Sequence, residues 1–245
     1  STETIKKTKM EMYDYILNKD GKIIYNLDDS VLTEVINQPE NHFGYGHSSG
    51  NVNGKVIDFH PTIEVEVNYR DGKQNIKTAL LGDFNLYNIL CAATVGDIFQ
   101  IKSETISKSL ESYTPSNHRS QLIKTKTNIV IADCYNANPT STLAALQSLS
   151  SMKVENKVAI LGDMLELGEN EDVEHQNIVQ FMYENNINGL LVGGIFSNLK
   201  CNFPTFEKVE FILPYLENVR YENYTILIKG SRGIKLEKII ENQIL

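Results

Sequence analysis

Hydrophobic and polar residues alternate with a period of two over residues 62–69, which is the pattern of a half-buried strand. Residues 77–81 are predicted to pair with this strand across the turn at Asp71 and Gly72. A short buried strand is predicted at 22–26, and residues 44–54, rich in Gly, Ser and Asn, are predicted to form a loop. Helices are predicted where apolar residues recur every three or four positions, at 4–17, 28–36, 85–99 and 103–113.

The second half of the chain alternates between short apolar runs and amphipathic segments. The apolar runs predict strands at 128–132, 157–161, 189–192 and 224–228, and the segments between and after them predict helices at 141–150, 171–184, 207–216 and 234–244. Strands separated by single helices indicate βαβ units and a parallel sheet, so the fold class is α/β. The polar stretch at 150–156 lacks a core pattern, and we place a domain boundary there, giving domains 1–151 and 152–245.

Composition and charge exclude several classes of protein. The chain has 245 residues, enough for two domains, and a net charge of -8 without a block of Lys or Arg, which argues against a nucleic acid partner. No apolar run reaches the roughly 18 residues of a transmembrane helix. Three widely spaced cysteines suggest neither a disulfide framework nor a zinc site, and a cytoplasmic location is expected.

Three predicted strands end in polar clusters, which begin at Asp133, Asp163 and Lys229. Ligands of open α/β sheets bind at the carboxyl ends of the strands, so these clusters are candidate binding residues. The turn Gly230–Gly233 offers free backbone N–H groups and a guanidinium, which suit a phosphate or a carboxylate. The alternative is that Asp133 and Asp163 only cap the helices that follow.

Lys9 lies on the predicted apolar face of the first helix, four residues after Ile5 and four before Tyr13. Either its stem snorkels along the core or the ammonium group has a function. Residues 50–55 superficially resemble a phosphate-binding loop, but the required first glycine is Ser49 and Lys55 is followed by Val56. The sequence therefore contains no P-loop.

The strand-end clusters carry a resemblance to a known family. Five segments resemble blocks of the Mur ligase family. They are Thr-Lys-Met-Glu-Met (8–12), Gly-Asp-Phe-Asn-Leu-Tyr-Asn (82–88), Asp-Cys-Tyr-Asn-Ala-Asn-Pro (133–139), Leu-Gly-Asp-Met-Leu-Glu-Leu-Gly (161–168) and Lys-Gly-Ser-Arg (229–232). The parts at 135–139 and 162–168 resemble MurF, the branch of the family that adds D-alanyl-D-alanine. The resemblance covers nearly the whole chain. It implies the latter part of a central ATPase domain followed by a Rossmann-like C-terminal domain.

The resemblance also implies roles for individual residues. Lys9 would be a carbamylated lysine, whose added oxygens ligate magnesium, and Arg119 would reach the phosphates of ATP. The residues implied to surround the nucleotide are Asn85 and Asn88 near the adenine, Asp133 at the ribose, and Tyr135, Asn136 and Asn138 around the pocket. The residues implied to bind substrate are Asp163, Ser231 and Arg232. Phe84 stands where the family often has a histidine.

The family reaction uses ATP and Mg²⁺ to phosphorylate the carboxylate of a UDP-muramoyl tripeptide, and the amine of D-Ala-D-Ala then attacks the acyl phosphate. The family's P-loop, its magnesium-binding Glu and His, and its UDP-binding domain would precede Ser1, so we expect this chain alone to be inactive. One alternative is a related ligase for another amino acid. Another is a non-catalytic nucleotide-binding or scaffold module derived from such a ligase.

Overall fold

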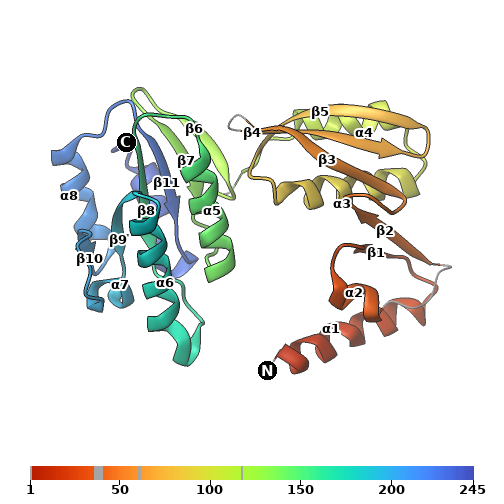
Figure 1. Ribbon diagram of the computed structural model, residues 1–245, viewed down its shortest axis with the longest axis horizontal. Helices are drawn as coiled ribbons and strands as arrows, with labels where there is room; N and C mark the ends of the chain where they lie inside the picture. The colour runs from red at the N-terminus through yellow and green to blue at the C-terminus, as the bar shows by residue number, and fades with distance from the viewer. Residues whose placement is uncertain (1, 36–40, 60–61, 117) are drawn as a thin grey trace. The chain divides into compact units, whose positions relative to one another are not determined.

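The computed structural model describes residues 2–35, 41–59, 62–116 and 118–245. Its contacts divide the chain into two compact units, one built from residues 1–79 and 83–113 and the other from residues 80–82 and 114–245 (Figure 1). The main division thus falls after Tyr113 and not at 151/152, where the polar stretch predicted it. The reason is that the strand at 129–133 pairs within the second unit.

The first unit is built on a five-stranded mixed sheet in the order β1-β2-β3-β4-β5. The strands are β1 (Ile23–Asn26), β2 (His42–Gly46), β3 (Val52–Phe59), β4 (Thr62–Tyr69) and β5 (Gly72–Leu81). β1, β2 and β3 run parallel, and β4 is antiparallel to β3. The alternation predicted for 62–69 is confirmed, because Ile63, Val65 and Val67 are buried along β4 while their neighbours are half-buried.

The helices in the described part of this unit are α1 (Thr2–Leu17), α2 (Ser30–Val35), α3 (Asn85–Ile98) and α4 (Ser103–Ser112). The apolar, Ala-rich α3 packs against the sheet, with Ile89, Leu90 and Ala93 fully covered. Residues 44–54 are not simply a loop, because β2 reaches Gly46 and β3 begins at Val52. The glycine-rich sequence of β2 hides the strand pattern there.

The second unit is a three-layer α/β/α fold around a six-stranded sheet, in the order β10-β9-β8-β11-β7-β6. The strands are β6 (Gln121–Lys124), β7 (Ile129–Asp133), β8 (Lys157–Gly162), β9 (Asn188–Val192), β10 (Thr205–Phe206) and β11 (Thr225–Lys229). All neighbouring pairs are parallel except β6 with β7. The parallel α/β sheet expected from the sequence is confirmed.

Helices cover both faces of this sheet (Figure 1). They are α5 (Pro139–Ser151), α6 (Glu171–Glu184), α7 (Gly194–Asn198), α8 (Val209–Val219) and α9 (Glu237–Glu241). Alternate strand residues enter opposite cores, so that Ala159 and Leu161 of β8 pack with α5 and α6, whereas Val158 and Ile160 pack with α8 and α9. Burial on both faces explains why these strands are uninterrupted apolar runs.

The helices in the described ranges all lack the combination of length and apolar surface that crossing a bilayer requires.

Candidate functional site

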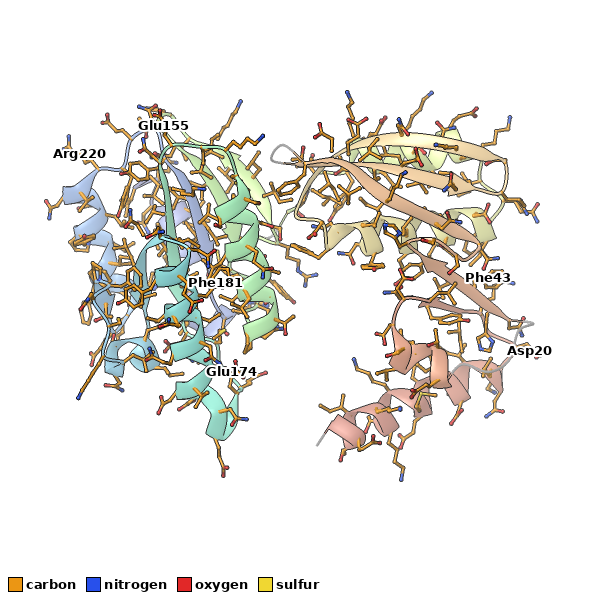
Figure 2. All side chains as sticks on the ribbon, in the orientation of Figure 1. Asp20, Phe43, Glu155, Glu174, Phe181 and Arg220 are labelled. Atoms are coloured by element: carbon orange, nitrogen blue, oxygen red, sulfur yellow. The ribbon has the colours of Figure 1, made fainter. Side chains whose placement is uncertain are left out.

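The carboxyl ends of β7, β11 and β8 lie side by side because the three strands are parallel neighbours. Their register places Lys229 of β11 opposite both Asp133 of β7 and Leu161 of β8. Glu155 and Arg220, which precede β8 and β11, mark the opposite end of the sheet in Figure 2. The three polar clusters predicted from the sequence therefore converge at one edge, where open α/β sheets bind ligands.

Asp133 is held at this edge by partners on both sides of its strand. Its Oδ1 accepts hydrogen bonds from the Ser120 backbone N–H at 3.0 Å and from Ser120 Oγ at 3.2 Å. Its Oδ2 accepts a 2.6 Å bond from Lys229 Nζ. A carboxylate has about four acceptor positions, and the described residues fill three of them, which leaves one on Oδ2 for a ligand hydroxyl. The side chain of Asp133 is 19% exposed and is therefore partly accessible to solvent.

Tyr135 forms an exposed aromatic platform for two arginines. The guanidinium carbon of Arg119 lies 3.6 Å from the centre of the ring, and that of Arg232 lies 5.5 Å from it. An arginine over an aromatic face is stabilised by the ring quadrupole and keeps its N–H groups free at the rim. Two cations gathered on one ring create a local positive potential that suits a phosphate or a carboxylate.

Asn136 and Asn138 shape the turn that leaves β7. Asn136 Oδ1 accepts from the backbone N–H of Ala137 at 2.9 Å, and its own carbonyl accepts from Lys229 Nζ at 3.3 Å. Asn138 is the N-cap of α5, in a capping box with Ser141 whose two bonds measure 2.8 and 3.2 Å. Asn138, and not Asp133, therefore caps the helix that follows β7.

Ser231 is buried and hydrogen-bonds to other segments of the protein, so it is not exposed for binding a ligand. It is 5% exposed, and its hydroxyl accepts from the Leu165 N–H at 2.9 Å and donates to the Ala137 carbonyl at 3.4 Å. It thereby joins the segments after β11, β8 and β7. The neighbouring Arg232 is exposed, so the arginine is the group of this pair that can contact a substrate.

Asp163 is buried, and its carboxylate binds backbone groups of the protein itself. It is 3% exposed, and its two oxygens accept from the backbone N–H groups of Ile195 at 2.9 Å and Phe196 at 3.0 Å, at the start of α7. The capping alternative thus describes Asp163, although the capped helix is α7 and not the segment that directly follows β8. Gly193 (φ 130°) permits this approach, because a Cβ there would lie 2.2 Å from the carboxylate.

His175 lies 3.9 Å from Asp163 without forming an ion pair. Its Nε2 accepts the backbone N–H of Met164 at 2.9 Å, so that nitrogen carries no proton. Its Nδ1 then donates to the Glu171 carbonyl at 2.7 Å. The ring is fully buried and neutral, and it fixes the segment that follows β8.

Lys9 belongs to the first unit and is exposed on α1. Its predicted inward orientation is not found, because the stripe that contains it is itself largely exposed: Ile5 is 59% and Met12 is 52% accessible. The described residues contain no group of three or more His, Cys, Asp or Glu side chains placed to hold a metal ion.

Asn85 and Asn88 lie in the first turn of α3, also in the first unit. Asn88 Nδ2 donates to Asn85 Oδ1 at 2.9 Å, and Asn85 is buried while Asn88 is exposed. Phe84 precedes them, 41% exposed, and makes no side-chain capping bond. This bond links the two side chains, and among the described residues no side-chain partner is found for the Asn88 oxygen.

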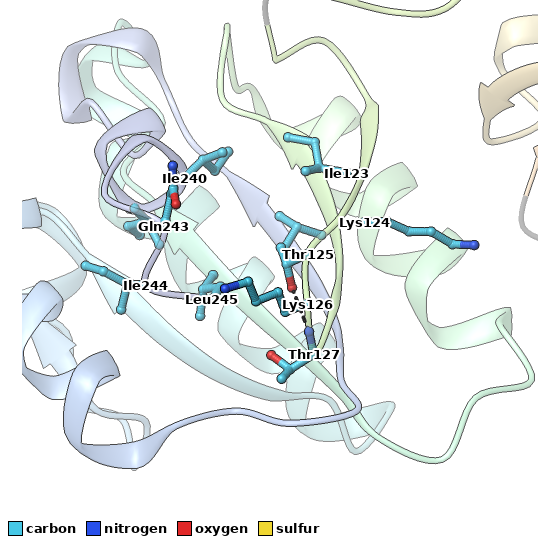
Figure 3. Close-up of a pocket in the computed structure, with 11 residues that line it drawn as sticks. Ile123, Lys124, Thr125, Lys126, Thr127, Ile240, Gln243, Ile244 and Leu245 are labelled. Carbon is cyan, nitrogen blue, oxygen red and sulfur yellow. Dashed lines mark hydrogen bonds between the residues drawn. The ribbon is translucent and has the colours of Figure 1, made fainter.

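A cleft of about 660 Å³ opens elsewhere in the second unit (Figure 3). It lies between the β6–β7 turn and the segment after α9, and its apolar lining includes Ile123, Ile240 and Leu245. None of the predicted site residues lines it. It adjoins the amino end of β7, the end opposite to Asp133.

The sequence predicts Lys229 only as the start of a polar cluster at a strand end, without its partner, and it does not predict Ser120. A lysine at the end of the otherwise apolar run 225–229 is the available signal for Lys229, since a buried cation needs a partner. Ser120 has no such signal, because its contact depends on the path of the loop before β6.

Comparison with known families identifies this architecture. The family described as the Mur ligase middle domain matches residues 1–96, and the family described as the Mur ligase glutamate ligase domain matches residues 118–195. The chain belongs to the Mur ligase family. The two matches leave 97–117 between them, which agrees with the structural division and not with a boundary at 151/152.

Two similar sequences carry the same enzyme name. The UDP-N-acetylmuramoyl-tripeptide–D-alanyl-D-alanine ligase of Rickettsia prowazekii is 28% identical over 98% of this chain and 57% of its own length. The ligase of the same name from Bacillus subtilis is 29% identical over 100% of this chain and 55% of its own length. The chain thus spans a little over half the length of these relatives.

Solved structures of Mur ligases share the fold. MurF from Acinetobacter baumannii superposes with a TM-score of 0.81 at 24% identity, covering 91% of this chain and 52% of its own. MurF from Thermotoga maritima, solved in complex with ADP, gives a TM-score of 0.77 at 19% identity, with 91% and 53% coverage.

Proposed function

We propose that this chain is the part of a MurF-type ligase that holds the ribose and phosphates of ATP and completes the site for D-Ala-D-Ala. The observation that carries the proposal is the arrangement at the edge of the second sheet. There Asp133 keeps one acceptor position open, while Arg119 and Arg232 share the ring of Tyr135. The similarity to UDP-N-acetylmuramoyl-tripeptide–D-alanyl-D-alanine ligases over nearly the whole chain supports the same conclusion.

The nucleotide would be held through complementary charges and hydrogen bonds. Asp133 would accept a ribose hydroxyl at its open position, and Arg119 would donate paired N–H groups to phosphate oxygens. Asn136 and Asn138 would shape the pocket by fixing the turn after β7. The adenine contacts that the family resemblance implies for Asn85 and Asn88, on the first unit, remain a prediction.

The carboxylate of D-Ala-D-Ala requires a positively charged group other than Arg119. Arg232 is exposed beside Tyr135, so we assign it to the carboxylate of D-Ala-D-Ala, with Ser231 fixing the turn from inside. Asp163 would support this edge through α7 without touching a substrate. ATP would activate the tripeptide carboxylate as an acyl phosphate, and the dipeptide amine would displace the phosphate. The arginines would stabilise the charge that develops in both steps.

Magnesium fits the described residues poorly, because they provide no cluster of ligating side chains. We therefore derive no step through a metal. Carbamylated Lys9 as a metal ligand remains a prediction from the family resemblance, and the exposed position of Lys9 leaves room for the modification.

Product analysis tests the proposal. The complete reading frame that contains this chain would be expressed and incubated with ATP, UDP-muramoyl tripeptide and D-Ala-D-Ala, with L-alanine and D-glutamate as control amines. We expect the mass of UDP-muramoyl pentapeptide with the dipeptide only. A product with another amino acid would indicate the related-ligase alternative. No product, together with retained ADP binding, would indicate the non-catalytic module.

A further inference from the structure

We propose that Lys229 is a positioning residue that orients Asp133 and, through Asp133, holds the loop at 118–120 so that Arg119 lies on Tyr135. The importance of this Lys229 role for catalysis rests on the proposed function. The contacts that carry it lie within the second unit and require no ligand.

Lys229 is almost completely withdrawn from water, with a side chain that is 2% exposed. A buried ammonium group is tolerated only where hydrogen bonds and an opposite charge replace its hydration. Lys229 Nζ has both, in the 2.6 Å bond to Asp133 Oδ2 and the 3.3 Å bond to the Asn136 carbonyl. One buried cation thus fixes the carboxylate and the turn that follows it.

Asp133 is also hydrogen-bonded to the loop at 118–120, so a fixed Asp133 carboxylate restrains that loop as well. Its other oxygen binds both the backbone N–H and the hydroxyl of Ser120. If the carboxylate turned, both bonds would be lost together. Lys229 holds Oδ2 in place, so it also determines where Oδ1 can receive Ser120.

The loop needs such a constraint because its backbone is unusual. His118 and Ser120 have φ values of 54° and 49°, in the left-handed region that non-glycine residues rarely adopt. Arg119 lies between them, with its guanidinium carbon 3.6 Å from the centre of the Tyr135 ring. Strained conformations of this kind persist only where surrounding contacts enforce them. The bonds from Asp133 to Ser120 provide that enforcement.

The test compares Lys229→Met with the unchanged 245-residue chain by NMR, without nucleotide. Methionine keeps the length and apolar stem of lysine but removes its charge and its donors. We expect faster hydrogen exchange at the Ser120 amide and loss of the upfield ring-current shift of the Arg119 side-chain protons. Exchange at core amides of β8 should stay unchanged. A folded variant that keeps both the Ser120 protection and the Arg119 shift would overturn the proposal.

A matched control and a second variant make the comparison decisive. Lys157→Met removes another lysine that binds backbone carbonyls, at the far end of α5, and should leave Ser120 and Arg119 unaffected. If Lys229→Met does not fold, Asp133→Asn decides: it keeps the shape of the side chain but weakens the charge-assisted bonds. It must also speed Ser120 exchange, and unchanged exchange would overturn the proposal.

Titration with ADP separates this proposal from the proposed function. We expect Lys229→Met to weaken ADP affinity about tenfold, as for the loss of one well-oriented hydrogen bond. Absence of ADP binding by the unchanged chain would contradict the proposed function. The exchange comparison would still decide the role of Lys229, because it is made without a nucleotide.

Discussion

Asp133 and Asp163 each end or follow an apolar strand, yet their surroundings differ. Asp163 is 3% exposed and caps α7 with both oxygens, whereas Asp133 is partly exposed and keeps one acceptor position open. Their sequence context is nearly the same, because each carboxylate comes directly after buried strand residues. The difference arises from the segments that fold back onto each strand end, and a short sequence window does not contain those segments.

When each aspartate is replaced separately, the Asp163 variant should lose stability and the Asp133 variant should lose ADP affinity. Asp163→Ala leaves two N–H groups of α7 without acceptors and should lower the free energy of unfolding by about 1–3 kcal/mol. ADP affinity should be unchanged. Asp133→Ala should instead weaken ADP binding about tenfold, through the lost ribose contact. Urea unfolding and calorimetric titration measure both quantities. An Asp163 variant that is fully stable but binds ADP poorly would contradict the assignment.

The cysteines should differ in reactivity. Burial raises the pKa of Cys134 to about 12, and the nearby Glu237 and Asp133 charges add to the effect. Because the thiolate is the reactive form, Cys134 should resist iodoacetamide at pH 8 in the folded chain and react only in urea. Cys91 and Cys201 are partly accessible and should react first. Peptide mass mapping over time measures the order. Equal rates at all three cysteines would contradict the described packing.

At the scale of elements, the sequence predicts most helices and strands because their apolar periodicity is regular. The elements that are not predicted are β2, β3, β6, β10 and α7. β6 is an edge strand of four residues whose Gln and Lys residues dilute the pattern, and β2 contains two glycines. The helix predicted at 234–244 is shorter in the structure, because Lys235 adopts a left-handed conformation and α9 begins only at Glu237. Backbone geometry of this kind depends on tertiary contacts.

The start of α5 offers a test of the turn after β7. Asn138→Ala removes the capping box and should lower the free energy of unfolding by about 1 kcal/mol. Asn138→Ser keeps a good capping side chain and should retain nearly all of the stability. If the role of Asn138 in the nucleotide pocket is to fix this turn, ADP affinity should follow stability across the two variants. Weak binding by a fully stable Asn138→Ser would indicate direct contact with the nucleotide.

At the scale of the whole molecule, the sequence predicts two units and the class of each, but the boundary at 151/152 is displaced. The strand predicted at 128–132 falls in the first predicted domain, because the polar stretch at 150–156 is the clearest break in the pattern. In the structure β7 pairs with β11, and Ile131, Leu146 and Leu149 belong to a core of the second unit. Strand order within a sheet is set by long-range pairing, which local polarity does not reveal.

Two fragments test this division. Residues 114–245 contain the complete second sheet and should unfold cooperatively in urea. Residues 152–245 lack β6, β7 and α5, so β11 loses a neighbour and one face of the sheet loses part of its cover. That fragment should expose apolar surface, bind a hydrophobic dye and unfold without a sharp transition. A cooperatively folded 152–245 fragment would restore the boundary that the sequence suggested.

The central claim is that the edge formed by Asp133, Arg119 and Arg232 serves ATP-dependent ligation of D-Ala-D-Ala. The most direct measurement is ADP formation by the complete reading frame, with each substrate omitted in turn, for the unchanged protein and for Arg119→Ala. We expect sustained ADP formation only when UDP-muramoyl tripeptide and D-Ala-D-Ala are both present, and a rate at least about a hundredfold lower for Arg119→Ala. ADP formation that needs neither substrate, or that is unchanged in Arg119→Ala, would contradict the claim.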